Sequence, residues 1–249
     1  MLKKIIIGNL VLAISLYASV INIAVAANVS YAIDDLKKEF NKSYPDTEIK
    51  VTLGSSGKLT AQIKNGAPYQ LFMDANMKFP QALYNDGVAI TKPVIYAQGS
   101  LAMLSDSKKD FTKGISLLKD SSINKIAVAN PKTAPYGKAA IEAMKNGGVL
   151  TDVKSKFVYA ESISQTVSYA ITAADIGFIA KSSLYSPKMS AYKKDINWAD
   201  LDPKLYTPIN QGIVVLKNGE ANSEVLAFYK FMLSAKAKKI LNNFGYIVP

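Results

Sequence analysis

Short apolar runs alternate with amphipathic stretches along most of the 249-residue chain. The apolar runs have the length of buried or half-buried strands and cover residues 20–26, 49–53, 71–73, 126–129, 157–159, 176–179 and 213–216. Between them, apolar side chains recur at helical spacing, which predicts helices at residues 33–40, 58–65, 79–83, 138–145 and 164–171 and further helices towards the C-terminus. Strands that alternate with helices indicate an α/β fold with parallel sheets and right-handed crossovers.

One apolar stretch, residues 94–104, is longer than the others and carries Gln98-Gly99-Ser100 in its middle. Its length predicts a single strand that passes from one domain into a second. The chain is long enough for two modest domains, each with its own core.

Four of the predicted strands end in small, neutral turns that lead directly into a helix. In such folds the ligand binds at the carboxyl ends of the strands, where these turns gather. The first turns of the helices offer N–H groups without an intrahelical partner, and the helix dipole favours an anion there. Two of the turns precede the stretch at 94–104 and two follow it, so neutral donors from both domains are expected to clamp one small oxyanion. The turns are Ala27-Asn28, Ser55-Ser56, Pro135-Tyr136-Gly137 and Ser162-Ile163.

Helix capping is the simplest alternative role for the polar residues of these turns. Ser55 and Ser56 could cap the helix that follows them, and Asn28 or Ser30 is a candidate cap for the helix over residues 33–40. The sequence leaves capping and ligand binding open.

Two enzyme motifs also compete for the second turn. A phosphate-binding P-loop fails, because Thr52 and Leu59 stand where that motif needs a glycine and a serine or threonine. Ser55-x-x-Lys58 matches the acyl-enzyme signature of penicillin-binding proteins, although its two companion motifs, Ser105-Asp106-Ser107 and Lys132-Thr133-Ala134, are off-pattern in their last residue. A secreted serine acyltransferase that uses Ser55 and Lys58 is therefore a remote alternative.

The first residues have the form of a secretory signal peptide. Lys3 and Lys4 precede an apolar run over residues 5–16, which is too short to span a membrane, and small residues suggest cleavage near Ala18. We therefore expect residues 1–18 to be removed and the mature protein to be exported.

The amino-acid composition excludes several kinds of metal site, catalytic group and partner. The chain has no Cys and no His, which excludes disulfides, thiolate metal sites, His-based triads and ordinary zinc sites. Its net charge of +11 comes from lysine alone, without the bidentate fork that arginine offers to phosphate and guanine. The lysines lie scattered over predicted helix faces, so we expect no nucleic-acid partner.

Several of these segments together resemble one family. From about Val20 to the C-terminus the chain is similar to the periplasmic molybdate-binding proteins of ABC uptake systems. The similar segments are residues 23–28, Ser55-Ser56-Gly57-Lys58-Leu59 with Gln62-Ile63 and Gly66-Ala67-Pro68, residues 71–75, Asn130-Pro131 with Pro135-Tyr136-Gly137, and the ending at 237–246.

The resemblance implies a type II periplasmic-binding-protein fold, in which two α/β lobes are joined by crossing strands and the ligand lies in the cleft. Residues 19–98 and 211–249 would form the first lobe and residues 99–210 the second, with a hinge near Gln98-Gly99 and Asn210-Gln211. The implied protein is a periplasmic monomer and not an enzyme. It would need no cofactor, hold molybdenum or tungsten only as molybdate or tungstate, and deliver this ligand to a membrane permease.

By motif position, the resemblance implies that Asn28 and Ser56 offer side-chain donors, and that Tyr136 and Ile163 offer main-chain N–H groups. Ala27, Ser55, Lys58 and Lys181 are possible additional contacts. One departure stands out: Ala180 occupies the place where many members carry a ligand-binding tyrosine. A sulphate or phosphate receptor is the nearest rival, but a phosphate site would need an acceptor such as Asp, and the four turns have none at their centres.

Overall fold

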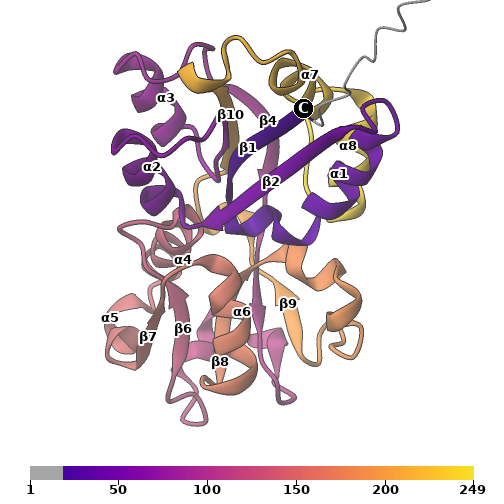
Figure 1. Cartoon of the computed structure of the whole chain (residues 1–249). Coiled ribbons are helices and arrows are strands. Elements are labelled where there is room, and N and C mark those ends of the chain that lie inside the picture. Colours follow the sequence, from indigo (N-terminus) through magenta and orange to yellow (C-terminus); the bar gives the residue numbers. More distant parts are fainter. Residues whose placement is uncertain (1–18) are drawn as a thin grey trace, which may run out of the picture.

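A computed structural model describes residues 19–249, so the predicted signal peptide lies outside the described residues. The chain forms two lobes, each built on a five-stranded sheet (Figure 1). The first sheet has the strand order β2-β1-β3-β10-β4 and the second β7-β6-β8-β5-β9. The strands are β1 (Ser19–Ala26), β2 (Thr47–Gly54), β3 (Leu71–Met73), β4 (Val94–Gly99), β5 (Leu101–Leu104), β6 (Ile126–Ala129), β7 (Phe157–Ala160), β8 (Ile176–Ala180), β9 (Trp198–Asp200) and β10 (Ile209–Val215).

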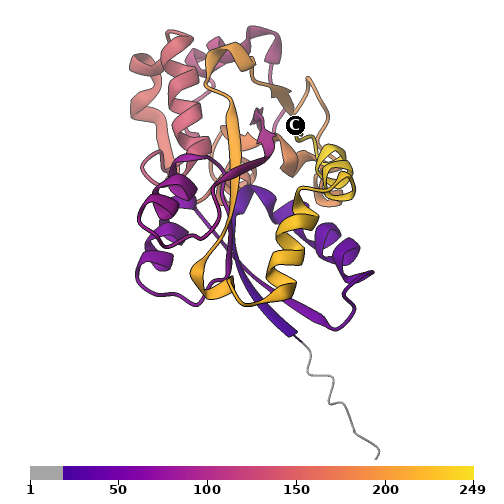
Figure 2. The same ribbon diagram turned by 90° about the horizontal axis from the view of Figure 1, so that it is seen from above.

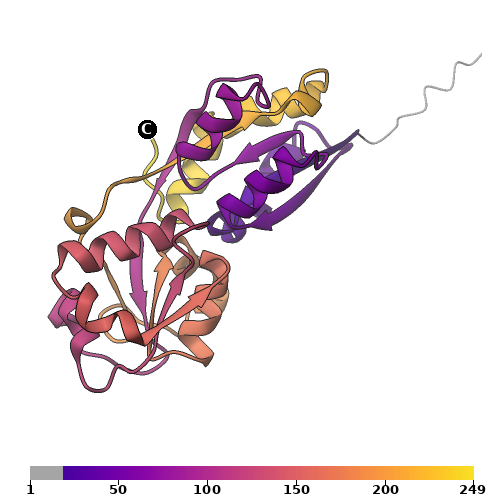
Figure 3. The ribbon, with the colours of Figure 1, turned by 90° about the vertical axis from the view of Figure 1, so that its left-hand side faces the viewer.

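Helices cover the faces of both sheets (Figure 3). They are α1 (Ile33–Asn41), α2 (Ser56–Lys64), α3 (Lys78–Asn85), α4 (Pro135–Asn146), α5 (Leu150–Val153), α6 (Ile163–Thr172), α7 (Ser223–Met232) and α8 (Ala235–Asn243). Short 3₁₀ segments lie between them, including Ala27–Tyr31 after β1 and Lys181–Tyr185 after β8. No helix within residues 19–249 has the length and apolar character needed to cross a membrane.

The sheets are mixed, whereas the sequence predicts parallel ones. β1 pairs in parallel with β2 and β3, but β10 runs antiparallel to both of its neighbours, β3 and β4. The reason is the path of the chain, because β4 leaves the first lobe and β10 returns to it in the opposite direction. In the second lobe, β5 is likewise antiparallel to β8 and β9.

The stretch at 94–104 forms two strands, which corrects the single strand predicted from the sequence. β4 ends at Gly99, opposite Ile209 of β10, and β5 begins at Leu101, opposite Ala180 of β8. At the break, the Leu101 N–H donates to the Tyr206 hydroxyl over 3.0 Å instead of to a neighbouring strand. The ladder therefore changes sheets at this point.

The apolar face of α1 packs where its spacing predicts. Ile33, Leu36 and Phe40 are buried, and the Phe40 ring meets the Phe228 ring of α7 edge-on at 5.1 Å. The C-terminal helices thus close the core of the N-terminal lobe (Figure 2). The predicted caps of α1 are wrong: Asn28 and Ser30 lie in the preceding 3₁₀ segment, and Ala32 occupies the cap position without a side-chain bond.

Candidate functional site

The four turns named in the sequence analysis meet at one small pocket between the lobes. The ends of β1 and β2 supply the first-lobe wall, and the first residues of α4 and α6 supply the second-lobe wall (Figure 1). The pocket has about 200 Å³ of empty space. It is lined by Ala26, Ala27, Asn28, Gly54, Ser55, Ser56, Ala75, Ala134, Pro135, Tyr136 and Ile163.

Six of the eight predicted contact residues line this pocket, and the two lysines do not. The Lys58 ammonium lies 3.8 Å from the Glu161 carboxylate, and the Lys181 ammonium lies 2.7 Å from Asp200. Both cations are thus engaged by acids. The pocket wall carries no charged side chain among the described residues.

Ser55 and Ser56 do not cap α2 through their side chains. Ser55 holds the cap position, but its hydroxyl donates to Glu161 Oε1 of the second lobe over 3.1 Å. The Ser56 hydroxyl is buried and completes no hydrogen bond with the residues that the structure describes. A buried hydroxyl without a partner costs free energy, so a pocket ligand that accepts its proton would be favoured. The capping alternative is therefore wrong for both serines.

Asn28 is fully buried, and its amide donors already have partners. Asn28 Nδ2 donates to Gln211 Oε1 over 2.9 Å and to the Tyr246 hydroxyl over 3.1 Å. Its main-chain oxygen accepts from the Tyr246 hydroxyl and from Ser182 Oγ. A ligand in the pocket would therefore meet the main chain of Asn28 rather than its amide N–H groups.

Gln211 extends this network into the second lobe. Its Nε2 donates to the Tyr136 hydroxyl over 3.0 Å, and its Oε1 also accepts from the Tyr96 hydroxyl over 2.9 Å. Burial raises the pKa of Tyr96 and Tyr136 well above the ordinary value and that of Tyr246 to about 12. These phenols stay neutral at physiological pH, so the network needs no compensating charge.

Tyr136 lines the pocket, and its phenol reaches the crossing strands, where the hydroxyl accepts from Gln211 Nε2. A Cβ placed on Gly99 would lie 1.9 Å from the Tyr136 hydroxyl oxygen. Any side chain at position 99 would overlap the Tyr136 phenol, so only glycine fits there.

Tyr136 and Ile163 stand in the first turns of α4 and α6, before the first intrahelical hydrogen bonds. In α4 the first such bond runs from Lys138 N to Ala134 O, and in α6 from Thr166 N to Ser162 O. Ser162 Oγ caps α6 by accepting from the Gln165 N–H. The N–H groups of Tyr136 and Ile163 are among those that helices leave to caps, water or ligands.

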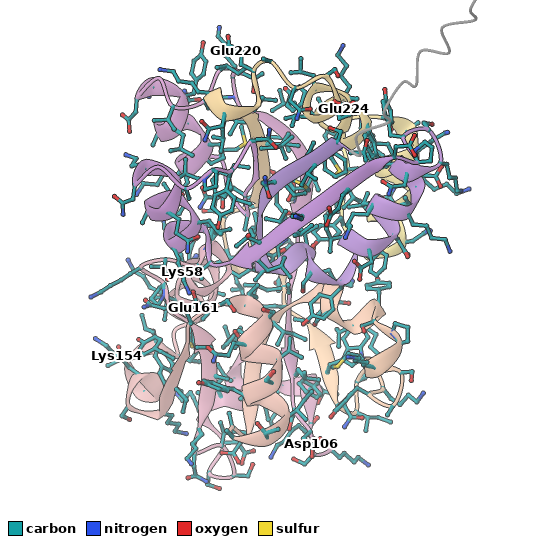
Figure 4. The ribbon with its side chains drawn as sticks, in the orientation of Figure 1. Lys58, Asp106, Lys154, Glu161, Glu220 and Glu224 are labelled. Atoms are coloured by element: carbon teal, nitrogen blue, oxygen red, sulfur yellow. The ribbon has the colours of Figure 1, made fainter. Side chains whose placement is uncertain are left out.

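The two lobes touch directly around the pocket. The Gly57 N–H of α2 donates to Thr133 O over 2.9 Å. Lys58 and Glu161 lie next to each other where the lobes meet (Figure 4). Together with the bond from Ser55 to Glu161, these contacts hold the pocket walls together.

The two residues that follow Ala180 do not replace the tyrosine that the resemblance implies at this position. Ala180 pairs with Leu101 in the second sheet. Of the two residues that follow it, Lys181 pairs with Asp200 and Ser182 Oγ donates to Asn28 O. Neither side chain is free to replace the missing hydroxyl.

A buried acid lies beside the pocket, at a position that the sequence does not predict as part of the site. Asp74 follows β3, next to the pocket residue Ala75, and its side chain is fully buried. Burial raises the pKa of its carboxyl to about 7, against the lowering effects of the Ser56 hydroxyl and of the Ala75 and Asn76 N–H groups. Asp74 stands in a fifth turn, at the end of the strand beside β1, outside the four neutral turns that the sequence predicts as the site. An acid directly after an apolar strand was the available signal.

A wider groove of about 750 Å³ adjoins the pocket at Ala134 and Pro135 and runs between α3 and α4. Three lysines line it, Lys78, Lys132 and Lys138, together with Glu142. This gives the approach to the pocket a positive charge. No group of three or more His, Cys, Asp or Glu side chains within residues 19–249 could hold a metal ion directly.

Comparisons with known proteins agree with this architecture. Two curated relatives carry the name molybdate-binding protein ModA. The one from Azotobacter vinelandii is 32% identical over 244 residues, which is 96% of this chain and 94% of the relative. The one from Rhodobacter capsulatus is 32% identical over 239 residues, which is 95% of this chain and 91% of the relative.

A solved structure, the periplasmic molybdate-binding protein of Azotobacter vinelandii, superposes with a TM-score of 0.84 at 29% identity, covering 92% of this chain and 99% of that chain. The predicted two-lobe α/β fold is thereby confirmed. The family model of bacterial extracellular solute-binding proteins matches residues 21–247. With nearly the whole chain matched, this protein belongs to the bacterial extracellular solute-binding proteins.

Proposed function

We propose that this protein is an exported, monomeric periplasmic binding protein that captures molybdate, and also tungstate, and delivers it to the membrane permease of an ABC importer. One observation carries the proposal: neutral donor groups from both lobes converge on a single small pocket without a charged lining residue. The curated relatives named for molybdate binding support the choice of ligand.

The proposed donors are the Ser56 hydroxyl and the main-chain N–H groups of Asn28, Tyr136 and Ile163. Ala27 and Ser55 add further main-chain groups to the same wall. Hydrogen bonds to a charged group contribute about 1.5–3 kcal/mol each, and helix N-termini add about 0.3–1 kcal/mol each. Several such donors together offset the cost of removing water from a dianion.

The wider groove supports a division of roles between binding and capture. Its three lysines lie outside the small pocket and attract anions from a distance, which raises the rate of association. The pocket donors then select among the anions by geometry. Salt should therefore slow association while leaving the preference between anions unchanged.

The two rival functions have less support. A phosphate site needs an acceptor for the ligand's proton, and Asp74 is not among the residues that line the pocket. An acyltransferase needs a free serine and a lysine beside it, but Ser55 donates to Glu161 and Lys58 pairs with the same carboxylate.

Titration calorimetry on residues 19–249 with molybdate, tungstate, sulphate and phosphate tests the proposal. Fixed donors on two lobes cannot shrink around the shorter bonds of sulphate without bending their hydrogen bonds, which weaken steeply below about 120°. If four contacts each lose about 1 kcal/mol, molybdate should bind on the order of a thousandfold more tightly than sulphate. Comparable affinity for sulphate would overturn the choice of molybdate.

The lobes, taken as residues 19–98 with 211–249 and residues 99–210, are proposed to open and close about the crossing strands. Gln98 and Asn210 pair across these strands, and a register shift follows at Gln211 and Gly212. Small-angle scattering with and without molybdate measures the movement as a change in the radius of gyration. An unchanged radius in a protein that binds would contradict the hinge but not the site.

A further inference from the structure

We propose that Asp74 is a proton-dependent positioning residue for the oxyanion pocket. In its neutral form its O–H donates to Ser56 Oγ, so that the Ser56 hydroxyl proton turns towards the ligand. In its ionised form the carboxylate takes that proton for itself, and the pocket loses a donor. The proposal rests on the proposed role of Ser56 as an oxyanion contact.

Two buried oxygen atoms without hydrogen-bond partners suggest that Ser56 and Asp74 interact. Ser56 Oγ and Asp74 Oδ1 are both buried, and neither completes a hydrogen bond within the protein. Both residues border the pocket, Ser56 as part of its lining and Asp74 next to the lining residue Ala75, and the Ser56 hydroxyl lowers the pKa of the Asp74 carboxyl. Asp74 Oδ2 is already used, because it accepts from the Asn76 N–H over 3.3 Å. Oδ1 is therefore the atom that is free to interact with Ser56.

A serine hydroxyl has a single proton, so its neighbours decide where that proton points. A carboxylate beside it only accepts hydrogen bonds, and it competes with an oxyanion for the Ser56 proton. A neutral carboxyl carries a donor of its own, and it leaves the Ser56 proton to the pocket. The two protonation states of Asp74 therefore have opposite effects on anion binding.

The surroundings of Asp74 favour the neutral state. From β10, Gly212 O accepts the Asp74 N–H, and from β4 the oxygen of the neutral Tyr96 hydroxyl lies 3.5 Å from Asp74 O. Three lysines lie on the other neighbouring helices: Lys58 of α2 pairs with Glu161, Lys64 of α2 pairs with Asp86, and Lys78 of α3 lines the wider groove. Among the described residues no cation contributes to the Asp74 pKa, which burial raises to about 7.

Anion binding and proton binding at Asp74 should therefore be coupled. A dianion in the pocket that Ser56 lines raises the free energy of the Asp74 carboxylate further. Asp74 therefore retains its proton to a higher pH in the ligand-bound protein than in the ligand-free protein. With a free-state pKa of about 7, the affinity for molybdate should fall about tenfold from about pH 6 to about pH 8. Molybdate stays a dianion over this range, so the ligand itself does not cause the change.

The test is calorimetry with molybdate at both pH values, in two buffers of different ionisation enthalpy. At about pH 8 the wild-type protein should take up close to one proton for each molybdate bound. Asp74→Asn carries an N–H donor at every pH, so its affinity should vary less than about twofold and no proton should be taken up. Asp86→Asn removes the same charge from an exposed acid that pairs with Lys64, and it should keep the wild-type pH dependence.

Ser56→Ala distinguishes an effect of Asp74 that is relayed through the Ser56 hydroxyl from direct repulsion between the Asp74 carboxylate and the anion. The same variant tests the proposal if Asp74→Asn fails to fold. If Asp74 acts through Ser56, this variant should lose most of the pH dependence. If the carboxylate merely repels the anion, the dependence will persist and the relay is wrong. Wild-type binding without proton uptake also overturns the proposal. Absence of molybdate binding at every pH overturns instead the proposed function on which it rests.

Discussion

The side-chain amide of Gln211 donates to the Tyr136 hydroxyl over 3.0 Å and so joins a crossing strand to the second-lobe helix α4. Gln211 is fully buried, and its oxygen also accepts from Asn28 and Tyr96. One glutamine thus connects the first pocket turn, the crossing strands and the third pocket turn. Because all of these groups are neutral, the connection can persist across the physiological pH range.

Removing the Tyr136 hydroxyl should destabilise the fold more than it weakens ligand binding. Tyr136→Phe leaves Gln211 Nε2 buried without its acceptor, which costs about 1–3 kcal/mol. Molybdate affinity should change little, since the proposed contact at this position is the main-chain N–H. Urea unfolding and calorimetry measure the two effects. Tyr159→Phe, at an exposed site, is the matched control, and a loss confined to affinity would show that the phenol contacts the ligand.

Removing the Ser56 hydroxyl should weaken ligand binding more than it destabilises the fold. Ser56→Ala should weaken molybdate binding by about 1.5–3 kcal/mol, or roughly tenfold to 150-fold, through loss of a charge-assisted hydrogen bond. Stability without ligand should change by less than the affinity does, because among the described residues this hydroxyl interacts only with the Asp74 carboxyl. Ser223→Ala, at the start of α7 and away from the pocket, provides the comparison. Unchanged affinity would remove Ser56 from the site.

The contacts of Glu161 across the lobes should slow ligand release. Glu161→Gln loses the ion pair with Lys58 and weakens the bond from Ser55. Both side chains of the ion pair are about half exposed, so the loss should be below about 1 kcal/mol and should shrink as salt rises. Stopped-flow measurement of the rate of molybdate release checks this prediction. Glu220→Gln, at the far end of the first lobe in Figure 4, should release the ligand at the wild-type rate. A rate that is equally unchanged in Glu161→Gln would contradict the role of these contacts.

Asp74 should make the fold less stable as the pH rises from about 4 to about 7. Its pKa is raised from 3.8 to about 7 in the folded chain, so over this interval the folded state holds a proton that the unfolded state has released. The stability that the neutral carboxyl provides is complete at low pH and is lost by about pH 7. The full difference is about 4 kcal/mol, at about 1.4 kcal/mol for each pKa unit.

Urea unfolding of the wild-type protein and Asp74→Asn at about pH 5 and about pH 8 checks this effect. The difference between the two proteins isolates Asp74 from the acids whose pKa values are lowered, such as Asp120 and Asp200. The wild-type protein should lose stability relative to the variant as the pH rises. A difference that stays constant would mean that Asp74 has the same pKa in both states.

Local patterns were sufficient for most of the elements around the site. The apolar run that ends in Ala26 and the turn before α2 were found because strand alternation, small turn residues and Pro68 act within a few residues of each other. The exceptions are informative. The break at Ser100 and the direction of β10 depend on strands that lie far away in the sequence.

The sequence alone determined where the neutral turns stand and that their chemistry suits an anion, since both follow from residue type and short-range spacing. Only the tertiary structure decided which donors remain free for it. Asn28 and Gln211 are 183 residues apart in the sequence, yet the Asn28 side-chain amide donates to Gln211 on the crossing strand β10 and is not free for the anion. Asp74 and Ser56 follow different strands and border the same pocket because β3 and β2 flank β1. Hydrogen bonds are short and directional, so their partners are set by the packing of distant segments, which no local pattern records.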